Sequence, residues 1–201
     1  MRHVSSAVLG AALLLIAAAC SQARATEYAI LAGGCFWCVE ADMDAVPGVL
    51  ETRSGYIGGK FDNPTYESHS AAGDLEAVEV TFDPAVVTYR ELLDIFWRTV
   101  DVTDDGGQFC DRGNSYRTAV FVADAEERAT AEASKAAAEE ALGQEIVTRI
   151  LDAPTFWPAE DYHQNYYTEN PLRYAGYRFA CGRDRQVEQV WGDQAYEGLA
   201  K

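Results

Sequence analysis

Basic residues are scarce in this sequence. Its 201 residues include 16 Lys and Arg against 32 Asp and Glu, which gives a formal net charge of −16 at pH 7. Nucleic acids and anionic membrane surfaces are bound through clusters of Lys and Arg. The composition therefore argues against both as partners and fits a protein that stays dispersed in solution.

Histidine is scarce too, and the Cys-x-x-Cys pattern occurs once. Structural zinc sites usually combine two such pairs, or one pair with two suitably spaced histidines. The chain has three histidines, of which His69 and His163 lie beyond the first 25 residues, and a single pair at Cys35 and Cys38. We therefore predict no bound metal.

The apolar run near the N-terminus, residues 7–19, is too short to span a membrane comfortably. It follows Arg2 and leads to the small-residue sequence A-R-A that ends at Ala25, which is the pattern of a secretory signal. A second interpretation stays open, because the residues up to Cys20 resemble a bacterial lipobox in which that cysteine carries lipid. We predict a signal over residues 1–25 and an exported, periplasmic protein that is soluble or lipid-anchored.

The rest of the chain, residues 26–201, is predicted to be one domain. Its length of about 176 residues is typical of a single domain with a sizeable core. Nearly half of the sequence, 48%, is apolar, and it contains neither an internal repeat nor a linker. We expect a monomer, with an irregular C-terminal tail from about residue 154 that is rich in aromatic and turn residues.

Apolar patterns alternate between those of strands and those of helices. Thr88 followed by Glu91 predicts a capping box at a helix start. The mixed order of elements predicts an α+β fold. The expected strands cover residues 28–33, 49–57, 76–82, 116–122 and 145–151, the helices 36–45, 88–100 and 125–142, and the polar loops 60–74 and 101–115.

A cysteine stands at the start of the first expected helix. Cys35 follows Gly33-Gly34 and an apolar strand, and it precedes Phe36 and Trp37. Backbone N–H groups and the helix dipole favour a thiolate at such a position, so we expect a lowered pKa for the Cys35 thiol. A reactive sulfur beside two aromatic rings indicates a nucleophile facing a small apolar pocket, although a lone cysteine is more often buried and inert.

Five sequence blocks, in order, identify a family. They are Gly34-Cys35-Phe36-Trp37, Asn63-Pro64-Thr65-Tyr66, Glu76-Ala77-Val78, Asp111-Arg112-Gly113-Asn114-Ser115-Tyr116-Arg117 and Ala159-Glu160-Asp161-Tyr162-His163-Gln164. The chain resembles the A-type peptide-methionine sulfoxide reductases, which reduce the S epimer of methionine sulfoxide, free or in oxidised proteins, to methionine. The resemblance implies a protein-repair enzyme with a two-layer α/β sandwich, a ferredoxin-like split βαβ core and no bound cofactor.

The resemblance also assigns catalytic roles. Cys35 matches the nucleophile that attacks the sulfoxide sulfur, and Glu76 matches the acid that protonates the sulfoxide oxygen. Tyr66 and Tyr116 match the phenols that hydrogen-bond this oxygen. The chemistry agrees, because the leaving oxygen must be protonated and burial beside aromatic rings raises the pKa of a Glu.

Substrate binding falls, by the same resemblance, to three further residues. Phe36 and Trp37 match the wall around the terminal methyl group of the substrate, and Asp111 matches a carboxylate that lines the site. Each matched residue has a plainer interpretation on its own, since tyrosines usually pack and Asp-Arg-Gly is an ordinary turn. The joint occurrence of the set carries the prediction.

Reduction of the substrate would leave Cys35 as a sulfenic acid, which a second thiol must attack. The candidates are Cys38, Cys110 and Cys181. Cys38 replaces the glycine that is usual in the family and lies about one helical turn from Cys35, so we predict that it resolves first. Cys181 is expected to pass the oxidation to an external thioredoxin-like dithiol; in the alternative, Cys110 and Cys181 form a static disulfide.

Two other functions stay open at this point. A general dithiol–disulfide oxidoreductase would also place Cys-x-x-Cys at a helix start, but it would leave Glu76, Tyr66 and Tyr116 without a role. An exported binding protein would hold its cysteines in structural disulfides instead, and the four cysteines beyond the predicted signal allow three pairings.

Overall fold

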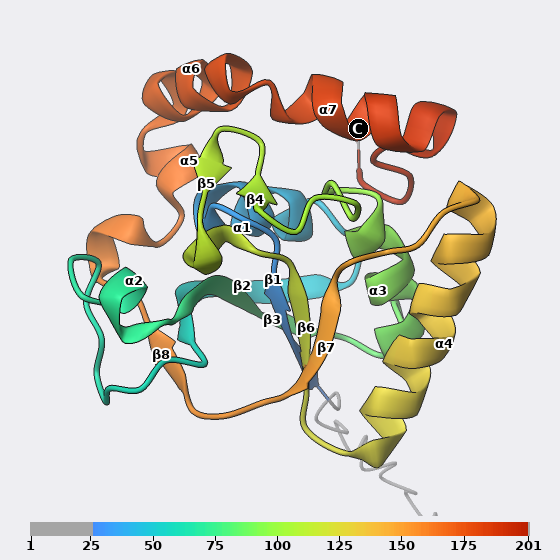
Figure 1. The fold of residues 1–201 in the computed structure, drawn as a ribbon, viewed down its shortest axis with the longest axis horizontal. Coiled ribbons are helices and arrows are strands. Elements are labelled where there is room, and N and C mark those ends of the chain that lie inside the picture. The colour runs from blue at the N-terminus through green and yellow to red at the C-terminus, as the bar shows by residue number, and fades with distance from the viewer. Residues whose placement is uncertain (1–25, 201) are drawn as a thin grey trace, which may run out of the picture.

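The computed structural model describes residues 26–200, so the predicted signal and Cys20 lie outside the described residues. A six-stranded sheet packs against helices, and the C-terminal helices cross one end of the molecule (Figure 1). The strands of this sheet are β1 (Glu27–Ala32), β2 (Val49–Ile57), β3 (Leu75–Phe82), β6 (Ala119–Val122), β7 (Arg149–Asp152) and β8 (Phe156–Pro158). The α-helices are α1 (Phe36–Asp44), α2 (His69–Ala72), α3 (Tyr89–Trp97), α4 (Ala125–Leu142), α5 (Tyr166–Glu169), α6 (Pro171–Cys181) and α7 (Arg183–Trp191).

The strand order confirms the predicted core. The elements β1-α1-β2-β3-α3-β6 form two halves, and their strands lie in the order β6-β1-β3-β2 with antiparallel neighbours. This is the split βαβ, ferredoxin-like arrangement. Strand β7 extends the sheet in parallel with β6 after the crossover through α4, and β8 pairs antiparallel with β2 at the other edge.

The main core fills the space between the sheet and its helices. Val78 and Val80 of β3 are two residues apart and both belong to this core, as the period of a strand requires. Phe96 of α3 packs in the same cluster. The predicted capping box fixes the start of α3, because Glu91 N donates to Thr88 Oγ1 while Thr88 N donates to Glu91 Oε2.

The expectation of an irregular tail from about residue 154 is wrong. This part of the chain forms β8 and then α5, α6 and α7. Its turn-forming residues lie at helix boundaries instead of replacing the helices: Pro171 opens α6, and Gly182, with a φ of 69°, separates α6 from α7. The two helices lie across the end of the molecule where α1 begins (Figure 1).

Two segments predicted as loops contain short elements. The one before β3 includes α2, and the one before β6 includes a hairpin of β4 (Gly107–Gln108) and β5 (Asp111–Arg112), followed by a 3₁₀ turn, η1 (Asn114–Tyr116). Tyr116 therefore lies ahead of β6, and the strand expected to begin at that residue begins at Ala119. Within residues 26–200, no helix has the length and hydrophobicity needed to cross a membrane.

Candidate active site

Cys35 lies at the junction of β1 and α1, where it occupies the N-cap position of the helix. Gly34 makes the sharp turn into the helix with a φ of 87°, and a Cβ at that position would lie 2.6 Å from Cβ of Gln108. Both the positive φ and the closeness of Gln108 therefore require glycine at this position. The turn buries the Cys35 side chain, which is 7% exposed.

A cavity of about 60 Å³ opens at this junction. It brings together every residue predicted for catalysis or substrate binding, and one residue that was not predicted. Its lining is Cys35, Phe36, Trp37, Tyr66, Glu76, Asp111, Tyr116 and Tyr177. Because these side chains come from α1, the loop before α2, β3, the β4–β5 hairpin, η1 and α6, the site depends on the whole fold.

Glu76 lies near the start of β3 and is buried, with 2% of its surface exposed. Its Oε2 accepts a hydrogen bond of 2.9 Å from Phe36 N, the first backbone N–H of α1. Burial raises the pKa of Glu76 to about 8, and the negative charge of nearby Asp111 adds to the shift. The carboxyl group is therefore mostly protonated at neutral pH, as a general acid requires.

Tyr66 and Tyr116 face the same cavity as Glu76. Burial, followed by the nearby Glu76 carboxyl group, raises the pKa of each phenol, so both are hydrogen-bond donors at neutral pH. Tyr116 also hydrogen-bonds to Glu76. The loop that carries Tyr66 is held by Glu160, whose Oε1 accepts from Tyr66 N at 3.0 Å.

The ring of Trp37 is fixed from two sides. It stacks on Tyr166 with 3.7 Å between ring centroids and 6° between planes, and its Nε1 donates to His163 Nδ1 at 3.1 Å. Phe36 packs against His163 with centroids 5.0 Å apart. His163 therefore holds the aromatic wall in place through packing and a hydrogen bond.

The expected lowering of the Cys35 pKa does not occur. Burial raises the pKa of this thiol, and a hydrogen bond that Cys35 donates to Cys38 raises it further. The helix start gives little compensation, because the Cys35 side chain makes no capping hydrogen bond and Phe36 N donates to Glu76 instead. The first backbone N–H of α1 therefore stabilises the Glu76 carboxyl group and not the Cys35 sulfur.

Cys38 is the thiol with the lowered pKa. The hydrogen bond from Cys35 lowers it against the effect of burial, and the cations Arg183 and Arg178 add to the lowering. Both guanidinium groups are held by Asp42, at 2.8 Å from Arg178 Nη1 and 3.4 Å from Arg183 Nε. The side chain of Cys38 is 2% exposed, so its sulfur is closed off from bulk water.

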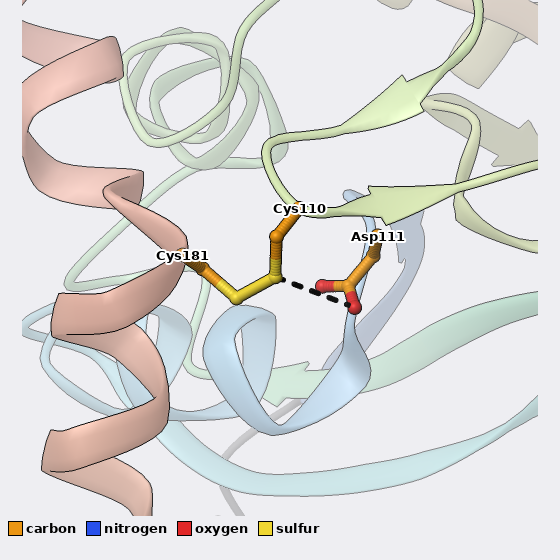
Figure 2. Close-up of side chains that lie close together, drawn as sticks. All are labelled: Cys110, Asp111 and Cys181. Atoms are coloured by element: carbon orange, nitrogen blue, oxygen red, sulfur yellow. Dashed lines mark hydrogen bonds between the residues drawn. A yellow bond between two sulfur atoms is a disulfide. The ribbon is translucent and has the colours of Figure 1, made fainter.

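The other two cysteines are joined. Figure 2 shows Cys181, at the end of α6, bonded to Cys110 in the turn between β4 and β5, with their Cα atoms 4.9 Å apart. This is the pairing of the static-bridge alternative, and it leaves Cys35 and Cys38 as free thiols. Asp111 lies beside the bridge, but a metal would require the two sulfurs to be free.

Two residues near the catalytic set were not predicted. Tyr177 of α6 donates a hydrogen bond to Asp111 Oδ2. His69 Nε2 lies 3.7 Å from Glu76 Oε1, and its Nδ1 contacts the Tyr66 carbonyl oxygen at 2.8 Å. Neither belongs to a motif in the sequence, and Tyr177 is one of several tyrosines in a segment expected to be irregular.

Comparison with known proteins agrees with this geometry. The family profile described as "Peptide methionine sulfoxide reductase" matches residues 27–195. The chain is 56% identical over 180 residues to "Peptide methionine sulfoxide reductase MsrA 2" of Rhizobium meliloti, covering 89% of this chain and 91% of the relative. A protein of the same name from Caulobacter vibrioides is 52% identical over 191 residues, covering 92% and 97%.

Solved structures resemble it as well. Methionine sulfoxide reductase A of Corynebacterium diphtheriae has a TM-score of 0.65 at 32% identity, covering 76% of this chain and 78% of its own. Reduced Mxr1 from Saccharomyces cerevisiae has a TM-score of 0.68 at 28% identity, covering 73% and 86%. Mxr1 in complex with Trx2 has a TM-score of 0.50 at 23% identity, covering 70% and 84%.

Proposed function

Because this chain belongs to the peptide methionine sulfoxide reductase family and is an oxidoreductase that reduces methionine sulfoxide, we propose that Cys35 is its nucleophile and Glu76 its general acid. The observation that carries this assignment is their meeting in one small cavity, with Glu76 buried against the helix that Cys35 begins. Phe36 and Trp37 form an apolar wall suited to the terminal methyl group, and Tyr66 and Tyr116 supply donors for the sulfoxide oxygen.

The first step begins with the hydrogen bond from Cys35 to Cys38. The Cys35 proton passes to the Cys38 sulfur, and the Cys35 thiolate attacks the sulfoxide sulfur. Glu76 gives its proton to the departing oxygen, which ends on Cys35 as a sulfenic acid while methionine leaves. The step starts from Cys38 as a thiolate, so one negative charge is on Cys38 before the step and one is on Glu76 after it.

The second step closes a disulfide. The Cys38 thiol attacks the sulfur of the Cys35 sulfenic acid, a Cys35–Cys38 bond forms, and the oxygen leaves as water with the Cys38 proton. Their interaction supports Cys38 as the resolving residue, because the two thiols lie within one turn at the start of α1 and no loop has to move to join them. Cys110 and Cys181 are farther along the chain and already bonded to each other.

The outer pair, Cys110 and Cys181, then takes over the oxidation from the inner pair, Cys35 and Cys38, and carries it to the surface. When Cys110 and Cys181 are thiols, Cys181 attacks the inner disulfide and Cys110 closes the outer bridge, so one dithiol is oxidised as the other is reduced. Exposure supports this order, since Cys110 is exposed while Cys35 and Cys38 are buried. An external thioredoxin-like dithiol is the reductant we propose, in line with the complex of Mxr1 and Trx2.

The substrates we propose are the S epimer of methionine sulfoxide, free and in oxidised proteins, which makes the chain a repair enzyme after oxidative damage. Its location in the periplasm as a monomer, soluble or anchored by lipid on Cys20, is also a proposal. The support for export is the sequence of residues 1–25.

The test measures activity on both epimers with dithiothreitol as reductant, beside an insulin-reduction assay. We expect reduction of the S epimer alone and little insulin reduction. Equal reduction of both epimers would contradict the epimer assignment. Insulin reduction without sulfoxide reduction would instead favour the general oxidoreductase.

A further inference from the structure

Tyr177 enters the cavity from an element that the catalytic motifs do not include. It lies on α6, one turn before Cys181, and its ring meets Trp37 edge-on with centroids 5.9 Å apart. Its hydroxyl group has two possible acceptors inside the site: it donates to Asp111 Oδ2, and it interacts with the Cys35 sulfur, which lines the same small cavity.

The hydroxyl is held in this place by its surroundings. The Cys110–Cys181 bridge ties the end of α6 to the hairpin that carries Asp111 (Figure 2). Arg178, the next residue, bonds Asp42 of α1 at 2.8 Å. Both partners of the hydroxyl are therefore fixed relative to α6, although α6 itself buries no side chain fully.

A phenol has a single proton to donate. Burial, followed by the nearby cysteine sulfurs, raises the pKa of Tyr177, so it keeps that proton throughout the working range of the enzyme. Two acceptors compete for it, the Asp111 carboxylate and the Cys35 sulfur. A neutral thiol is a weak acceptor and a thiolate a strong one, so the preferred acceptor depends on the charge of Cys35.

We propose that Tyr177 is a catalytic residue, whose hydroxyl donates to Asp111 while Cys35 is a thiol and donates to the Cys35 sulfur when this becomes a thiolate. The phenol thereby supplies the stabilisation that the helix start does not give. It acts on the nucleophile, whereas Tyr66 and Tyr116 act on the sulfoxide oxygen. This inference rests on the proposed role of Cys35.

The test compares Tyr177→Phe with Tyr167→Phe as matched control. Tyr167 also donates to a carboxylate, Asp44 Oδ2 at 2.8 Å, but it does not line the cavity. The readout is the pH dependence of Cys35 alkylation by iodoacetamide without substrate, with Cys35 and Cys38 separated by peptide mapping. The first reductive step is measured in parallel by methionine release in a single turnover.

We expect Tyr177→Phe to raise the midpoint of Cys35 alkylation by about one pH unit and to slow the first step about tenfold, the size of one lost hydrogen bond to a charged group. Tyr167→Phe should leave both unchanged. A slower first step with an unchanged midpoint would overturn the proposal, since the phenol would then act elsewhere. Because alkylation involves no substrate, an unchanged midpoint would contradict the role of Tyr177 whether or not the chain has the proposed function.

A double-mutant comparison tests the competition between the two acceptors. Asp111→Asn weakens the competing acceptor, so it should lower the Cys35 midpoint in the otherwise native chain. In the Tyr177→Phe background the same substitution should have a smaller effect. Equal shifts in the two backgrounds would show that Tyr177 does not link Asp111 to Cys35, and would overturn the proposal.

Discussion

Two cysteine pairs lie at the same end of this molecule, and they differ in burial, charge and bonding. Cys35 and Cys38 are buried free thiols within one turn at the start of α1, beside two cations held by Asp42. The outer pair is bonded, and its Cys110 is exposed. The difference separates two tasks: sulfoxide reduction needs a dry site that controls protons, and reduction by another protein needs a reachable disulfide.

Removal of the inner nucleophile should have the largest effect. Cys35→Ser should end turnover while the fold persists, because a hydroxyl group is far less ionised than a thiol and a far weaker nucleophile toward sulfur. The assay is methionine formation with excess dithiothreitol. The double variant Cys110→Ser/Cys181→Ser keeps the inner pair and should retain this activity. If it lost as much activity as Cys35→Ser, the two pairs would not have separate tasks.

Removal of the general acid, Glu76, should have the second-largest effect. Glu76→Gln should slow the first step by about 10²–10⁴-fold, the usual contribution of a general acid, with a smaller change in substrate binding. In the native chain this rate should fall as pH rises through about 8, because the protonated form of Glu76 is lost there. The rate of the Glu76→Gln variant should not decrease in this pH range. Single-turnover rates between pH 6 and 10 provide the measurement, and an unchanged rate with weaker binding would make Glu76 a binding residue.

The effect of Cys38→Ser should be confined mainly to recycling. One methionine per protein should still form, more slowly, because serine is a poorer acceptor for the Cys35 proton. Turnover with a thioredoxin-type donor should stop, and the Cys35 sulfenic acid should accumulate, as trapping with dimedone would reveal. Unimpaired turnover with that donor would move the resolving role to the outer pair.

The outer bridge should matter more for stability than for the first step. It closes a loop with a sequence separation of 71, so Cys110→Ser/Cys181→Ser should lower the free energy of unfolding by about 2–4 kcal/mol in urea titrations. Single-turnover methionine release should be close to native. Turnover with a thioredoxin-type donor should fall, and if it does not, the bridge is static and the inner pair meets the donor directly.

The sequence was sufficient for the parts of the molecule where local pattern and fold agree. The capping box of Thr88 and Glu91 and the range of α4 follow from periodicity and caps, whereas the strand order around β1 and β3 was expected only through the family resemblance. The catalytic and binding set could be named because its members lie in recognisable motifs, and the structure places them in one cavity.

The parts that could not be predicted depend on contacts between distant segments. The pKa of Cys35 rises because burial and the diversion of Phe36 N to Glu76 outweigh the helix start, and no local pattern reports either. Tyr177 reaches the site only because α6 is a helix tied to the β4–β5 hairpin. Asn and Gly at helix ends made that segment look irregular, although they mark the boundaries of α5, α6 and α7.

In the proposed mechanism, oxidation starts in the inner pair, Cys35 and Cys38, and moves to the outer pair, Cys110 and Cys181. The direct test maps disulfides by mass spectrometry over time, after the fully reduced chain receives one equivalent of methionine sulfoxide without reductant. We expect the Cys35–Cys38 disulfide to form first and the Cys110–Cys181 disulfide to appear as it decays. An early Cys35–Cys181 or Cys35–Cys110 disulfide, with Cys38 left free, would contradict it.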